Sequence, residues 1–66
     1  MKINKLKAKM VEKGINVETL STKIGVERST LYRKLNNFDK ITIGEAVKMK
    51  AALEMTDTEA INIFLA

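Results

Sequence analysis

Two arginines, a serine and a tyrosine lie close together near the middle of the chain, and their side chains can contact nucleic acid bases. The guanidinium groups of Arg28 and Arg33 can each donate two parallel hydrogen bonds to O6 and N7 of guanine. Ser29 can bond to several groups and discriminates little, and Tyr32 either contacts DNA or packs on the surface. We predict base contacts for these four residues, with the alternative that an arginine pairs with Glu27 or with a phosphate and reads no base.

A second set of polar residues suits the phosphate backbone instead of the bases. Lysine ammonium groups and threonine hydroxyls bond to phosphate oxygens, and such contacts set the register of a protein on a duplex. We predict phosphate contacts for Thr19, Lys23, Thr30, Lys34 and Asn36.

The segment before the two arginines is typical of a short helix that ends in a tight turn. Asn16 can cap this helix with its side-chain oxygen, so the helix begins at about Val17. Leu20 and Ile24 supply an apolar stripe at helical spacing. Gly25 ends the helix, because glycine readily adopts the left-handed conformation of a C-terminal cap.

A second short helix follows the turn and carries the predicted base contacts. It runs from about residue 27 or 28 to Leu35, and Leu31 and Leu35 face inward. Asn36 and Asn37 indicate its end, since asparagine tolerates the left-handed conformation. Two short helices joined by a glycine-containing turn form the helix-turn-helix pattern, whose second helix can enter a DNA major groove.

Outside this motif, which spans residues 16–36, we predict three further helices, over residues 2–13, 43–54 and 57–65. The first carries Ile3, Leu6 and Met10 at spacings of three and four residues. The other two each open with the T-x-x-E spacing of a capping box, at Thr42 and at Thr56. The sequence therefore predicts five helices.

Basic residues are concentrated in the first half of the chain. The net charge is +4; residues 1–34 hold nine Lys and Arg against three Glu, and residues 35–66 hold three Lys against five acidic residues. This asymmetry indicates a side that faces a polyanion, although solubility alone would explain it equally well. On the first helix, Lys5 and Lys9 share a face and either touch phosphates or stay solvated.

The composition excludes several classes of site. The chain has no Cys and no His, which excludes disulfides, thiolate chemistry, Cys/His zinc sites and an imidazole base. It offers no nucleophile–base arrangement and no glycine-rich phosphate loop, so we predict no enzyme activity, cofactor, metal or small-molecule substrate. No apolar run approaches the ~20 residues that span a bilayer, and the lysine-rich N-terminus lacks the apolar region of a signal peptide. We expect a cytoplasmic protein without a membrane partner.

The last predicted helix carries more apolar residues than one narrow face can hold: Ile61, Ile63, Phe64 and Leu65. A terminal helix of this kind either buries both sides or covers something external. We infer that one side packs on the domain and the other on a second copy, with dimer contacts from Ile61, Phe64 and Leu65.

Several motif residues together carry a resemblance to a known family: Leu20, Gly25, Val26 and Leu31, with the run Ser-Thr-Leu-Tyr-Arg-Lys-Leu from Ser29 to Leu35. With these residues the chain resembles the Cro/phage-repressor (XRE-type) class of helix-turn-helix proteins, most of all small Gram-positive prophage Cro-like proteins. The resemblance covers essentially the whole chain. It implies a single compact, all-α, lambda-repressor-like domain over residues 1–66, with helices 2 and 3 as the motif. It also implies a homodimer that binds operators in double-stranded DNA and acts as a transcriptional repressor or switch.

The resemblance assigns roles to single residues. Arg28 and Ser29 match base-reading positions at the start of the recognition helix, and Arg33 matches a third one turn further on. Tyr32 matches an exposed position that can reach a base edge, a methyl group or a phosphate. Val17 falls where the family often places a glutamine that contacts DNA, and valine cannot make that polar contact.

Two more positions depart from the family's pattern. Glu27 replaces the Ser or Thr that normally caps the recognition helix; it suits the helix dipole and can accept a hydrogen bond from a cytosine amino group. Lys34 occupies a position that is often apolar, and Leu35 takes over the packing.

Two alternatives stay open at this point. The same fold also serves as a protein-interaction module, of the antitoxin-like or adaptor kind, in which the C-terminal apolar face holds a different partner. The chain is either a whole small protein, which a start at Met1 and the final helix favour, or the N-terminal domain of a longer repressor.

Overall fold

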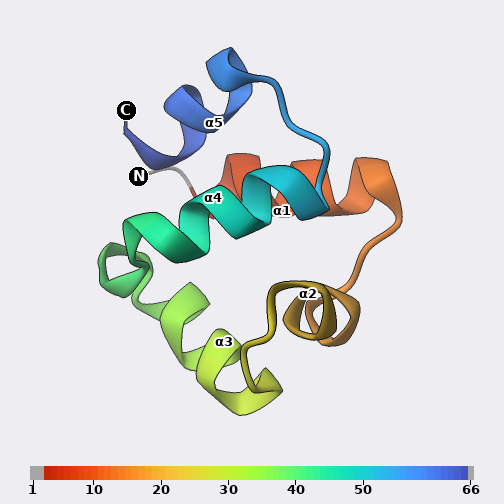
Figure 1. Cartoon of the computed structure of the whole chain (residues 1–66), viewed down its shortest axis with the longest axis vertical. Helices are drawn as coiled ribbons and strands as arrows, with labels where there is room; N and C mark the ends of the chain where they lie inside the picture. Colours follow the sequence, from red (N-terminus) through yellow and green to blue (C-terminus); the bar gives the residue numbers. More distant parts are fainter. Residues whose placement is uncertain (1–2, 66) are drawn as a thin grey trace.

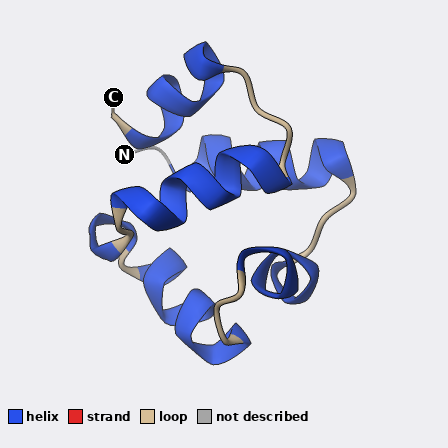
Figure 2. Ribbon diagram, in the orientation of Figure 1, coloured by secondary structure: helices blue, strands red, loops and turns tan. Residues whose placement is uncertain are grey.

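The computed structural model describes residues 3–65, apart from the side chain of Asp39, and it consists of helices joined by short connections (Figure 1 and Figure 2). In chain order these are α1 (Ile3–Lys13), α2 (Val17–Ile24), α3 (Arg28–Asn36), the short 3₁₀ helix η1 (Phe38–Lys40), α4 (Ile43–Ala52) and α5 (Asp57–Phe64). Residues 3–65 contain no strand, so the predicted all-α fold with five α-helices is confirmed. Within this described part, no helix is both long enough and apolar enough to cross a membrane.

The core is shared by all five α-helices. In Figure 1, α4 crosses the middle of the molecule, with α2 and α3 on one side of it and α5 on the other. The fully buried side chains come from α1, α2, α3 and α4 and from the residue that follows α4; they are Leu6, Leu20, Leu31, Met49 and Leu53. Because each of these helices contributes at least one side chain to a common interior, packing between helices stabilises elements that are too short to persist alone.

The predicted helix-turn-helix geometry is confirmed at its cap and its turn. The side-chain oxygen of Asn16 accepts a hydrogen bond of 2.8 Å from the amide of Thr19, so α2 begins at Val17. Gly25 ends α2 in the left-handed conformation, with φ of 72°, and its amide donates to the carbonyl of Ser21. A side chain at this φ would be strained, which is why glycine suits the turn.

Both predicted capping boxes are present, and each also binds a lysine from an earlier helix. In α4, one carboxylate oxygen of Glu45 accepts from the amide of Thr42 at 2.9 Å, and the other accepts from Lys34 Nζ at 2.5 Å. In α5, Glu59 accepts from the amide of Thr56 at 2.9 Å and from Lys9 Nζ at 2.6 Å. The two glutamates therefore tie α4 to α3 and α5 to α1.

Because its ammonium is bound to Glu59, Lys9 is no longer a candidate for phosphate contact. Lys9 is 9 % exposed, and its ammonium also lies 2.9 Å from the carboxylate of Glu12. Its hydrogen bonds with Glu59 and Glu12 raise the pKa of Lys9. The lysine is therefore committed to holding α5 against α1, whereas Lys5 is exposed.

Three helix ends differ from the predictions. α4 ends at Ala52, not at residue 54, because Glu54 adopts the left-handed conformation with φ of 51° and turns the chain there. α3 includes Asn36, and Asn37 ends it without the expected left-handed conformation, since its φ is −134°. α5 ends at Phe64, one residue before its predicted end. The predicted beginning of the first helix, at residue 2, lies outside the described residues.

We expect the fold to lose stability in acid because of the two capping-box glutamates. Hydrogen bonding to Lys9 lowers the pKa of Glu59 from 4.5 to about 2, and hydrogen bonding to Lys34 lowers the pKa of Glu45. Below pH 4.5 the unfolded chain therefore binds more protons than the folded one. The stabilisation is complete above that pH and is lost as the pH falls toward 2.

Thermal unfolding followed by circular dichroism between pH 7 and pH 2 measures this effect. Glu59→Gln should lower the midpoint at pH 7 and flatten its dependence on pH in the acid range. Glu54→Gln is the control, because the Glu54 carboxylate is exposed and lies 3.9 Å from Lys13. Equal pH dependence in wild type and Glu59→Gln would contradict the assignment.

Candidate nucleic-acid interface

The outer face of α3 presents all four residues predicted to read bases. Leu31 and Leu35 point into the core, with exposed fractions of 0 % and 8 %. The helical period then places the other side chains of α3 on faces that point away from these leucines. The exposed residues among these include Arg28, Ser29, Tyr32, Arg33 and Asn36.

Carboxylates next to the start of α3 engage the first two of these side chains. Arg28 Nη1 lies 3.3 Å from a carboxylate oxygen of Glu18 in α2, and both side chains are exposed. Ser29 Oγ donates to Glu27 at 2.8 Å. Arg28 thus pairs with Glu18 and not with Glu27, the partner considered from the sequence. Glu18 lies ten residues before Arg28, so this contact depends on how α2 and α3 pack.

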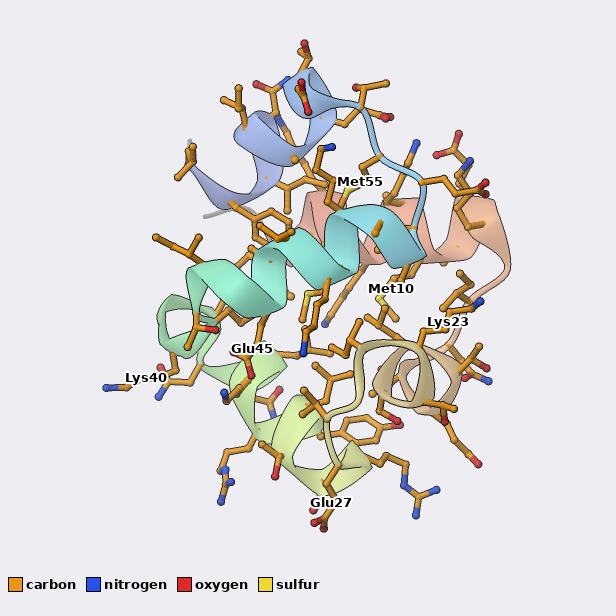
Figure 3. The ribbon with its side chains drawn as sticks, viewed as in Figure 1. Met10, Lys23, Glu27, Lys40, Glu45 and Met55 are labelled. Carbon is orange, nitrogen blue, oxygen red and sulfur yellow. The ribbon has the colours of Figure 1, made fainter. Side chains whose placement is uncertain are left out.

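Glu27 departs from the usual cap of such a helix. It occupies the N-cap position of α3, but its side chain makes no capping hydrogen bond to a backbone amide. Figure 3 shows it at the outer end of α3, directed away from the rest of the molecule. Because the first turn of α3 holds no acidic residue of its own, the carboxylates of Glu27 and Glu18 supply the negative charge that this helix end favours.

The residues predicted to contact phosphate lie in two different places. Thr19 and Lys23 are exposed on α2, four residues apart, and both line a shallow polar hollow along that helix. Thr30 and Lys34 are half-buried and lie four residues apart on α3, and Lys34 pairs with Glu45 of α4. In Figure 3, Glu45 lies between α4 and α3, whereas Lys23 is at the outside of the molecule.

The ion pair gives Lys34 a role that the sequence did not indicate. The Lys34 side chain is 25 % exposed and that of Glu45 is 16 % exposed. In the family that the chain resembles, the position of Lys34 is often apolar, and here a paired ammonium occupies it. Lys34 therefore lies in contact with α4, whereas Lys23 extends into solvent.

An apolar groove beside Tyr32 was not predicted from the sequence. Val11, Ile15 and Val17 line it together with Tyr32, in a hollow of about 500 Å³ between the end of α1, the start of α2 and α3. Val11 is 81 % exposed and Tyr32 is 52 % exposed. Val17 occupies the position where the family often places a glutamine that contacts DNA. Its side chain packs against the core from the wall of this groove.

A second apolar surface, which we call the α4–α5 patch, consists of Ile43 and Val47 on α4 with Ile61 on α5 and Leu65 directly after it. These are four of the six large apolar side chains that are exposed among the described residues. They surround a hollow of about 180 Å³. The i, i+4 spacing of Ile43 and Val47 after the capping box was the signal that could have revealed the α4 half.

The structure corrects one of the three predicted dimer contacts. Phe64 is 6 % exposed, and its ring centroid lies 5.8 Å from that of Phe38. The ring packs on the domain itself because Phe64 shares the inner face of α5 with Ile63, which is 4 % exposed. Ile61 and Leu65 are exposed at 52 % and 77 %, so these two can meet a partner.

Comparison with known families places the arrangement in context. The Cro/C1-type HTH DNA-binding domain matches residues 5–63, which is nearly the whole chain. Comparisons with curated proteins and with solved structures give no significant match. The matched range includes α2, the Gly25 turn and α3, whose outer face carries the polar side chains described above. The chain therefore belongs to the family of Cro/C1-type helix-turn-helix DNA-binding domains.

Proposed function

We propose that this DNA-binding regulator is a sequence-specific transcriptional repressor of the phage Cro-like kind, which binds a palindromic operator as a homodimer. The observation that carries the proposal is the row of exposed polar side chains on α3, Arg28, Ser29, Tyr32 and Arg33, on a helix whose other face is anchored by buried leucines. Guanidinium groups on a rigid helix are the commonest means of reading guanine in the major groove.

The dimensions of α3 agree with insertion into a major groove. A helix of nine residues is about 13 Å long, and the groove is about 12 Å wide. Such a helix reaches only a few base pairs, which is too little to select one site among many. Doubling the helix on a two-fold symmetric site supplies the missing affinity and specificity.

The α4–α5 patch supports the homodimer. Its four members are uncharged, so two copies of the patch can meet without removing charges from water. A two-fold interface brings the same patch of both subunits together, and an apolar surface is complementary to itself. Half-sites in the operator should then lie about one helical turn, ~34–36 Å, apart.

Selection of bound sequences from a random DNA library, at a fixed salt concentration, tests the proposal directly. We expect enrichment of two inverted half-sites whose centres are about one turn apart. Enrichment of a single half-site would contradict the dimer, and no enrichment over the starting library would contradict sequence-specific binding.

Salt dependence should separate Lys23 from Lys34. Lys23→Ala should make the plot of log affinity against log salt shallower by about one unit, because one phosphate contact is lost. Lys34→Ala should change this slope much less, because its ammonium already pairs with Glu45; its effect should appear as about 0.5–1 kcal/mol of lost stability. Equal slopes for the two variants would show that Lys34 leaves Glu45 to bind phosphate.

The second candidate function, a protein-interaction module, is favoured by one observation. The groove between Val11, Val17 and Tyr32 is apolar and open, and of the residues predicted to read bases only Tyr32 lines it. In a pure interaction module, retention on DNA would be weak, whereas capture of a partner protein would be insensitive to salt. DNA retention that weakens steeply with salt would instead support the regulator.

A further inference from the structure

One ion pair connects the two helices of the motif at the ends where each begins. Glu18 is the second residue of α2 and Arg28 is the first residue of α3. Arg28 Nη1 donates to Glu18 Oε2 at 3.3 Å. The arginine with the best chemistry for reading a base is therefore held by a carboxylate from the neighbouring helix.

The adjacent carboxylate, that of Glu27, bonds to a different side chain. The first turn of α3 has no acidic residue, and Glu27 accepts a hydrogen bond of 2.8 Å from the hydroxyl of Ser29. A guanidinium at the beginning of a helix is also disfavoured by the positive end of the helix dipole, and a carboxylate beside it offsets this. Glu18 provides that carboxylate.

The contact leaves a useful edge of the guanidinium unoccupied. Arginine presents five N–H donors in a planar fork, and Glu18 engages a donor on Nη1. The edge formed by Nε and Nη2 keeps two parallel donors. Two parallel donors are what a bidentate contact with O6 and N7 of guanine requires.

We propose that Glu18 is a positioning residue for base recognition, whose carboxylate holds the Arg28 guanidinium so that its Nε–Nη2 edge faces a guanine. The inference rests on the proposed DNA-binding function. Glu18 has an opposite effect on binding that lacks specificity, because its negative charge repels phosphates along any duplex. The correct operator recovers that loss through Arg28, and other sequences do not.

Glu18→Gln tests these opposite effects of Glu18 on specific and on non-specific binding. Glu27→Gln is the matched control, because it removes one negative charge near the start of α3 without touching Arg28. Affinity is measured for the selected operator, for the operator changed at the base pair that Arg28→Ala identifies, and for an unrelated duplex. Both side chains of the pair are exposed, 61 % for Arg28 and 70 % for Glu18, so loss of the pair should leave the protein folded.

Glu18→Gln should reduce the ratio of operator to changed-operator affinity about 3- to 10-fold, a part of what one arginine–guanine contact provides. Its binding to the unrelated duplex should become tighter. Glu27→Gln should tighten binding to the unrelated duplex but preserve the ratio at this base pair, because Glu27 bonds to Ser29 and not to Arg28. In an Arg28→Ala background, Glu18→Gln should no longer change the ratio.

The outcomes separate this inference from the function on which it rests. If the wild type and Arg28→Ala discriminate the operator differently but Glu18→Gln behaves like Glu27→Gln, Glu18 acts through its charge alone and the positioning role is wrong. If Glu18→Gln still lowers the ratio without Arg28, the role belongs to another contact. If the wild type does not discriminate any operator, the proposed function fails and the positioning role fails with it.

Discussion

Arg28→Ala is expected to bind the operator about 1–3 kcal/mol more weakly than the wild type and to lose its preference at one base pair in each half-site. The guanidinium is exposed at the start of α3 and keeps two parallel donors beyond its contact with Glu18. Alanine removes these donors without disturbing the core, because the Arg28 side chain is 61 % exposed and the anchors of α3 are Leu31 and Leu35. Affinity for operators substituted singly at each position measures the effect.

Arg33→Ala serves as the comparison on the same helix. It lies one turn further along α3 and should relax preference at a different base pair. Arg28→Lys should not rescue the lost preference, because an ammonium lacks the planar fork that bonds to guanine bidentately. If Arg28→Ala weakened binding equally for every sequence, the guanidinium would contact only phosphate.

The beginnings of the helices could be predicted because their signals are local. Asn16, Thr42 and Thr56 each cap a backbone amide three residues away, so the pattern that causes the structure lies within one turn of the chain. The turn signal of Gly25 is also local, because it depends only on the positive φ of this glycine. The C-terminal end of α4 was missed because Glu54 has no intrinsic preference for the left-handed conformation that it adopts.

The partners of charged residues could not be predicted for the opposite reason. Lys9 and Glu59 are 50 positions apart, and Lys34 and Glu45 are 11 apart, so their pairing depends on how whole helices pack. Helical periodicity predicted that Arg28 would be exposed, but not that Glu18 would hold it. The orientation of Phe64 also depends on packing, since several apolar residues of α5 compete for its inner face.

The two lysine–glutamate pairs show how a chain of this size fixes helices that flank its core. Each glutamate has one oxygen bound to the amide of its own cap residue, and this hydrogen bond restrains its side-chain rotamer. The second oxygen then offers a fixed acceptor to a neighbouring helix. Lys34 thereby fastens α3, which bears the proposed reading residues, to α4, which bears half of the α4–α5 patch. This contact therefore links the proposed reading helix to the helix that carries half of the proposed dimer surface.

Ile43→Asp is expected to convert the proposed dimer into monomers. Ile43 is 83 % exposed in the monomer and belongs to the α4–α5 patch. Burying an isoleucine side chain contributes about 1.5–3 kcal/mol, and a two-fold interface counts the residue twice, so dimerisation should weaken by at least about 100-fold. Aspartate at the first position of α4 suits the helix dipole, so the monomer itself should stay folded. Phe64→Asp cannot serve here, because it would place a charge in the core and unfold the domain.

Val11→Asp is the matched control, since Val11 is equally exposed, at 81 %, but lies on α1 outside the patch. Sedimentation equilibrium should show Ile43→Asp as a monomer at concentrations where the wild type and Val11→Asp are dimers. On DNA, Ile43→Asp should bind an isolated half-site as well as the wild type does, because α3 is unchanged, and should lose the additional affinity for a complete operator. A wild type that remains monomeric at high concentration, or equal loss in both variants, would exclude the α4–α5 patch as the surface that pairs two copies.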